Sequence, residues 1–239
     1  MHVSRFSTHL LCLLLVSHVP CTFGQVLSGE DSSCGPLRPP GQYGPYDFRS
    51  DRDKLSVVVT NHFQPFVEQL IRGQTGALGA DIAFTLRAIP NHPNALMSMM
   101  LLGEKEKTPN PRGSDYSVEC WFERAIRFRP DDNVVRMIYT VFLTKNKRKP
   151  EAMQQLDIVL TTAKDNALTY NNVGLLYFDL GEYQKALVQA HKAIELGLNR
   201  PDLRDQLQSV GKWSDPVAGT SEIPTPEPGA PAASGTLKP

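Results

Sequence analysis

The chain has 239 residues and carries 25 Lys and Arg against 25 Asp and Glu, a formal net charge of +0. A balanced chain without a basic stripe is not expected to bind nucleic acid, so the short run at 145–149 is interpreted as a solvated turn. No apolar stretch reaches the length that crosses a bilayer, so stable membrane insertion is not expected either.

Residues 1–24 have the pattern of a secretory signal peptide. Arg5 and His9 precede the apolar run at 10–16, and small residues lie near Gly24. We expect export across the inner membrane, most directly into the periplasm. A lipid anchor on Cys21 is the alternative, although the residues before it form a poor lipidation signal.

Export changes the cysteine count. Cys12 and Cys21 leave with the signal peptide, and the Pro/Gly-rich segment 25–49 keeps Cys34. An exported protein with two remaining cysteines, Cys34 and Cys120, is expected to join them in a disulfide, which stabilises by about 3–4 kcal/mol in the loop-entropy model. The alternative is that Cys120 is a buried thiol on an apolar helix face.

A helical domain is predicted over residues 50–213. Ser50, with an acid three residues later, resembles a helix start, and that helix should stop near Thr60. A second helix should begin at Pro65 and end at Gly73, where a helix-terminating glycine is expected. Residues 81–89 should form its partner.

Two residue pairs repeat along this domain. Alanine–isoleucine pairs begin at Ala88, Ala125 and Ala193, and pairs of an aliphatic residue with glycine end at Gly103 and Gly174. Their separations of 37, 68 and 71 residues fit one period of about 34 residues if three extra residues lie in one loop. The turn-rich segment 108–115 is the predicted site of that insertion.

The same register predicts a degenerate repeat at about 133–166. It places Thr140 where the glycine belongs and Ala152 where the second helix packs. After the last repeat, residues 201–211 are predicted to form a capping helix with Leu203, Leu207 and Val210 on its apolar face.

The clearest repeat is 167–193, where small and large residues alternate across a predicted helix–helix contact: Gly174, Ala186 and Ala193 against Tyr170, Tyr177 and Tyr183. This spacing resembles a tetratricopeptide repeat (TPR). The resemblance implies an all-α fold, a right-handed α-solenoid of about four TPR helix hairpins with a C-terminal capping helix. The chain also resembles exported proteobacterial TPR proteins in which a Cys-Gly-Pro-Leu segment, here 34–37, precedes the repeats.

In that family the first helix of each repeat lines the concave face of the array. Similarity places ten residues there as a partner-binding groove: Met97, Met100, Glu104, Val134, Met137, Val141, Leu168, Asn171, Leu175 and Phe178. Such a groove is apolar and methionine-rich, which suits a helix or an extended peptide of a partner. The alternative is that the N-terminal segment held by Cys34 covers these residues and makes them core.

No catalytic, metal-binding or cofactor-binding constellation is predicted. The sequence has no HExxH, GxSxG, phosphate-binding glycine loop or calcium loop, and the histidines at 62, 92 and 191 are interpreted as loop or surface residues. We therefore expect a protein that is not an enzyme and needs no cofactor.

Two functions follow as hypotheses. The first is an exported adaptor or assembly factor that binds another protein. The alternative is an accessory or carbohydrate-binding subunit of an envelope enzyme complex, with sugar stacking on Tyr43, Tyr46, Phe48, Trp121 and Trp213. Residues 214–239, rich in Ser, Thr, Pro, Gly and Ala, are predicted to be a disordered tail.

Overall fold

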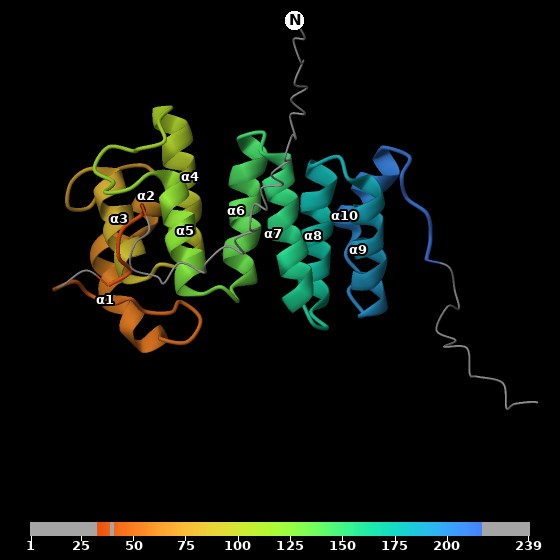
Figure 1. The fold of residues 1–239 in the computed structure, drawn as a ribbon, viewed down its shortest axis with the longest axis horizontal. Coiled ribbons are helices and arrows are strands. Elements are labelled where there is room, and N and C mark those ends of the chain that lie inside the picture. The colour runs from red at the N-terminus through yellow and green to blue at the C-terminus, as the bar shows by residue number, and fades with distance from the viewer. Residues whose placement is uncertain (1–32, 39–40, 217–239) are drawn as a thin grey trace, which may run out of the picture.

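The computed structural model describes residues 33–38 and 41–216, and within these ranges it is all-α, without strands. The predicted signal peptide and most of the predicted tail lie outside the described residues. Figure 1 shows the helices standing side by side in an elongated row. In chain order they are α1 (Arg52–His62), α2 (Pro65–Glu68), α3 (Leu78–Ala88), α4 (Pro93–Glu106), α5 (Val118–Phe128), α6 (Asn133–Lys145), α7 (Lys149–Thr162), α8 (Ala167–Asp179), α9 (Tyr183–Glu195) and α10 (Pro201–Ser209).

The helices form two layers. Helices α2, α4, α6, α8 and α10 contact one another in succession, and we call them the A layer. Helices α3, α5, α7 and α9 form the B layer, in which successive members make few contacts or none. The pairs α6–α7 and α8–α9 are closely packed hairpins.

The predicted degenerate repeat is confirmed as a helix hairpin, α6 followed by α7. Both Thr140 and Ala152 are fully buried, as the register requires. Gly174 lies against Ala186 of α9, and Gly103 lies against Val118 of α5 at the equivalent place. The insertion at 108–115 is likewise a loop, between α4 and α5.

The N-terminal helices depart from the expectation. No side chain caps α1, and the carboxylate of Asp51 accepts a hydrogen bond from the Asp47 backbone amide instead, so Ser50 is not the cap. Helix α2 has only 4 residues and ends before Leu70, whose φ is 56°. The chain turns back here because buried Asp81 accepts hydrogen bonds from the Gln74 and Thr75 amides and from the Thr75 hydroxyl.

The first alanine–isoleucine pair does not occupy the same position in its helix as the second pair. Ala88 is the last residue of α3, whereas Ala125 lies a turn before the end of α5. Helix α4 compensates with an extra turn at its start, where Pro93 follows the N-cap His92.

The capping helix is confirmed as α10, which packs on α8 and α9. Its contact face is narrower than predicted. Leu203 and Leu207 are buried, but Val210 is exposed because the helix ends at Ser209 and Gly211 follows with a φ of 66°.

Candidate partner-binding surface

The ten predicted groove residues all lie on A-layer helices, but they are not equally accessible. Met97, Val134 and Leu168 are 38, 48 and 47% exposed. Glu104 is exposed, and four others are half-buried: Met137, Val141, Leu175 and Phe178. Met100 and Asn171 are buried, so neither side chain is exposed on the A-layer surface, although Met100 lines the cavity described below.

Met97, Val134 and Leu168 are equivalent residues of three successive helices, α4, α6 and α8. Each lies six positions before the residue at the tight helix–helix contact, which is Gly103, Thr140 or Gly174. Because these three helices contact one another in order, the exposed side chains form a row across the A layer. We call these three residues the A-layer row.

A cavity of about 760 Å³ opens between α4, α5 and α6, toward the C-terminal ends of α4 and α6. The loop inserted at 107–117 separates the end of α4 from the start of α5, so this hairpin does not close as α8 and α9 do. Met100, Val118 and Phe142 supply apolar walls. A volume of this size is typical of ligand pockets.

Ion pairs join the helices around this cavity. Lys145 Nζ lies 3.0 Å from a carboxylate oxygen of Glu104, and Arg148 Nη1 lies 2.5 Å from Oε1 of Glu119. The same Glu119 oxygen accepts a hydrogen bond of 2.7 Å from the hydroxyl of Tyr139. Burial, with the Glu119 carboxylate beside it, raises the pKa of Tyr139 far above its ordinary value, so this hydroxyl stays protonated. Charged side chains of both signs therefore line the cavity.

The N-terminal segment does not cover the A layer. Its described residues 33–38 and 41–51, which we call the strap, run along the B layer and the loops at its end. The backbone amide of Tyr46 donates to the carbonyl of Ala88, and that of Phe48 donates to Asn91 Oδ1. The alternative in which this segment buries the groove is thus not supported by the strap.

Two sets of interactions attach the strap to the helices. The first is the predicted disulfide, which is present between Cys34 and Cys120, with Cα atoms 5.2 Å apart. Beside it the fully buried guanidinium of Arg124 donates from Nη1 to the carbonyls of Cys34, Gly35 and Pro36 at 2.8–3.3 Å. Arg127 donates to the Gly35 carbonyl at 2.8 Å.

The second set is a polar network between the strap and two loops, the α3–α4 loop and the α5–α6 loop. Asn91 Nδ2 donates to Asp47 at 2.7 Å and to Asp132, the N-cap of α6, at 2.9 Å. Arg49 and Arg129 pair with Asp47 at 3.3 and 2.9 Å. Although burial opposes ionisation, hydrogen bonds from Arg49 and Asn91 lower the pKa of Asp47 to about 2.

Sequence reasoning missed Arg124 and this network. An arginine within the otherwise apolar α5 face, beside Trp121 and Tyr116, was the available signal for Arg124. The network joins Asp47 to residues 44 and 85 positions away, and no local pattern indicates such pairs.

The histidines form no catalytic arrangement among the described residues. His62 Nδ1 lies 3.2 Å from Asp81 and its ring stacks on Phe84. His191 contacts Trp213 and the backbone of Ser214. His92 lies in the loop before α4, within the expectation of a loop or surface residue, but it is buried because its ring caps α4 and packs between Phe48 and Phe63.

The aromatic residues proposed to stack on sugars do not share a cleft. Trp121 is buried and donates from Nε1 to Ser114, Phe48 packs on His92, and Trp213 packs on His191 at the opposite end of the chain. Only Tyr43 is exposed, with Tyr46 packed against its edge.

Within the described residues no helix is long and apolar enough to pass through a membrane. Comparisons with models of protein families, with curated proteins and with solved structures found no match.

Proposed function

We propose that this protein is an exported adaptor that binds a segment of another protein on its A layer. The A-layer row is the observation that best supports this proposal. A large apolar side chain is exposed at the same repeat position in three successive helices of the A layer. Isolated exposed apolar residues are common, but a set repeated at one position of three successive helices favours a docking face. A peptide in helical or extended form fits such a row.

The array itself is proposed to be of the TPR type, a right-handed α-solenoid. The proposal rests on the period of about 34 residues and on its agreement with the packing of α6–α7 and α8–α9. Such hairpins are expected to have a small residue of the first helix at the close contact and a buried alanine on the second helix. Thr140 and Gly174 occupy the first position, and Ala152 and Ala186 occupy the second.

Export to the periplasm is part of the proposal. The disulfide supports it, because such bonds persist in oxidising compartments. The carbohydrate-binding alternative loses support because its aromatic residues are buried or far apart.

The test places a charge on the A-layer row. Val134→Asp and Leu168→Asp should each abolish capture of the partner, since a buried carboxylate in the complex would lack a counter-charge. Both side chains are exposed in the free protein, so folding should survive, as circular dichroism would check. Buried Met100 is unsuitable for this purpose because Asp there would unfold the helix contact.

The matched control is Val188→Asp. Val188 lies on α9 in the B layer and is 61% exposed. Capture is measured from a periplasmic extract, and photo-crosslinking from position 134 or 168 then identifies the contacted segment. Equal capture by the two A-layer variants, the control and the wild type would contradict the proposal.

A further inference from the structure

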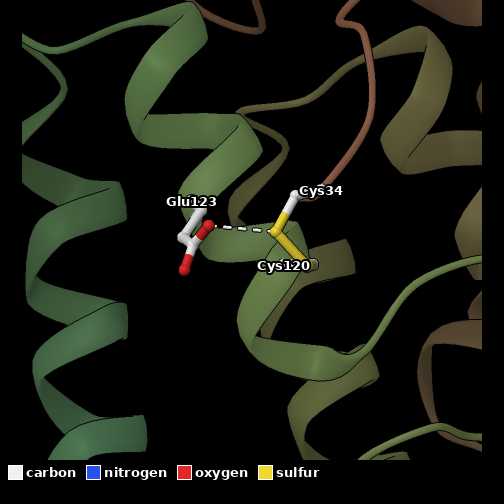
Figure 2. Close-up of side chains that lie close together, drawn as sticks. All are labelled: Cys34, Cys120 and Glu123. Carbon is white, nitrogen blue, oxygen red and sulfur yellow. Dashed lines mark hydrogen bonds between the residues drawn. A yellow bond between two sulfur atoms is a disulfide. The ribbon is translucent and has the colours of Figure 1, made fainter. Parts of the chain in front are cut away.

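Three side chains that bind metals well meet at the junction of the strap and α5. Cys34 Sγ, Cys120 Sγ and a carboxylate oxygen of Glu123 all lie within 4.8 Å of one another. Figure 2 shows Cys120 and Glu123 side by side on α5, with Cys34 reaching them from the strap. Glu123 Oε2 is 2.9 Å from Cys34 Sγ. A disulfide sulfur has no proton, so this is a sulfur–oxygen contact that becomes a hydrogen bond once Cys34 is a thiol.

The positions of the three groups do not depend on the disulfide alone. Arg124 and Arg127 hold the carbonyls of residues 34–36 through four hydrogen bonds, and both belong to α5 with Cys120 and Glu123. Reduction of the S–S bond therefore leaves Cys34 beside the other two groups. Cys34 is 1% exposed, Cys120 is half-buried and Glu123 is exposed, so the junction opens to solvent on the α5 side.

The ligand set and its charge select the class of ion. Two thiolates and one carboxylate carry three negative charges, which a divalent ion and the buried Arg124 guanidinium balance. Thiolate ligands favour Zn²⁺ over Mg²⁺ and Ca²⁺, and zinc sites accept two Cys with a third protein ligand and water. Two thiolates on tetrahedral Zn²⁺ lie about 3.8 Å apart, so the two sulfur atoms would move apart when the ion binds.

We propose that Cys34, Cys120 and Glu123 are a two-state site: a disulfide when oxidised, and a binding site for Zn²⁺ or a similar thiophilic divalent ion when reduced. A phosphine reductant takes the oxygen of one water, and the disulfide receives two electrons and two protons to give two thiols. Binding of Zn²⁺ to the two sulfur atoms then releases both thiol protons. The strap stays attached to α5 in both states.

The experiment uses the full chain with Cys12→Ser and Cys21→Ser, so that Cys34 and Cys120 are the only thiols. The protein is reduced with a phosphine, freed of the reductant without air, and titrated with Co²⁺. We expect one equivalent to give the thiolate-to-cobalt charge-transfer absorption, which Zn²⁺ abolishes by displacement. The oxidised protein should show neither effect.

Glu123→Gln tests the third ligand. The variant should still form the disulfide, which confirms that it folds, and should bind Zn²⁺ about tenfold or more weakly, since even loss of an outer-shell partner costs that much. Glu195→Gln, an exposed carboxylate of α9, is the matched control and should bind like the parent. Cys120→Ser should lose the charge-transfer band.

Absence of the band in the reduced protein, with two free thiols and helicity retained, would overturn the site. Unaltered affinity in Glu123→Gln would overturn the three-ligand geometry. If the reduced protein loses helicity, failure of Zn²⁺ to restore it would also overturn the proposal.

Discussion

A single buried histidine makes the stability of this protein sensitive to mild acid. The ring of His92 lies between Phe48 and Phe63, with ring centroids 4.6 and 5.0 Å away, and its Nδ1 accepts a hydrogen bond from the Ala95 amide. Burial lowers the pKa of His92 from 6.5 to about 4. The folded protein thus holds this side chain neutral where the unfolded chain protonates it.

We predict that the free energy of unfolding falls as the pH is lowered from about 6.5 to about 4. In this window the unfolded state binds the proton and the folded state does not, so stability rises with pH and is fully present above 6.5. The loss is at most about 3 kcal/mol. Urea unfolding at a series of pH values measures it.

His92→Asn is the matched control, because Asn also caps a helix but does not titrate in this range. Its stability should vary less between pH 6.5 and 4. The carboxylate of Asp47, whose pKa is about 2, loses its contribution only below its ordinary value of 3.8, so the two effects are separable. An equally steep profile in wild type and variant would show that another group is responsible.

The pairing of Cys34 with Cys120 is confirmed, and it was predicted because only these two cysteines remain after the expected signal peptide. Val134 and Leu168, which the TPR resemblance assigned to the groove, are exposed. The burial of His92 did not follow, because Phe48 reaches it from the strap, 44 positions away. Met100 and Asn171 were misplaced because the family register gives the face of a helix but not how deeply neighbouring helices bury it.

At the scale of elements, close approach of α8 to α9 and α10 depends on Gly174. A methyl group there would lie 2.3 Å from Leu203 Cδ2 and 3.3 Å from both the Ala186 carbonyl oxygen and Gln189 Cβ. The helix preference of alanine favours Gly174→Ala by about 1 kcal/mol, but the clash opposes it. Leu203 is 1% exposed and has little room to move.

We predict that Gly174→Ala is destabilising by about 1–2 kcal/mol and Leu203→Ala by about 2–4 kcal/mol. The double variant should lose less than the two single losses together, because the new methyl occupies space left by the leucine. A double-mutant cycle by chemical denaturation measures this coupling. Strictly additive losses would mean that α8 and α10 do not meet at this point.

Contacts between adjacent helices explain why some elements were predicted correctly from the sequence and others were not. Helices α6 to α9 were located from the spacing of small residues, since that spacing fixes how two adjacent helices meet, and α10 was located from its apolar face. Helix α2 was predicted too long because its end is set by Asp81, which draws residues 74 and 75 toward α3. Such a link between a loop and a later helix leaves no periodic signal.

At the scale of the whole molecule, the disulfide closes a loop of the chain that contains α1 to α4 and reaches the start of α5, and it leaves α6 to α10 outside. A loop of this length stabilises by about 4 kcal/mol in the entropy model. In a linear stack each hairpin depends mainly on its neighbours, so this contribution should be local.

We predict that Cys34→Ser with Cys120→Ser accelerates amide hydrogen exchange in α1 to α5 and leaves α8 to α10 nearly unchanged. Hydrogen-exchange mass spectrometry resolves the two regions, and Leu207→Ala in α10 provides the reciprocal control, with its effect at the other end. Uniform acceleration along the chain would show that the array unfolds as one cooperative unit.

The crosslink also determines how the protein responds to mechanical tension. A force applied between the two ends of the chain enters at Cys34, crosses the sulfur–sulfur bond and continues from Cys120. Helices α1 to α4 lie outside that load path, and only α5 to α10 carry the pull. The A-layer residues Met97, Glu104 and the walls of the cavity contributed by α4 are thereby shielded from extension. A stretched chain would lose its C-terminal hairpins first and keep the covalently closed part folded.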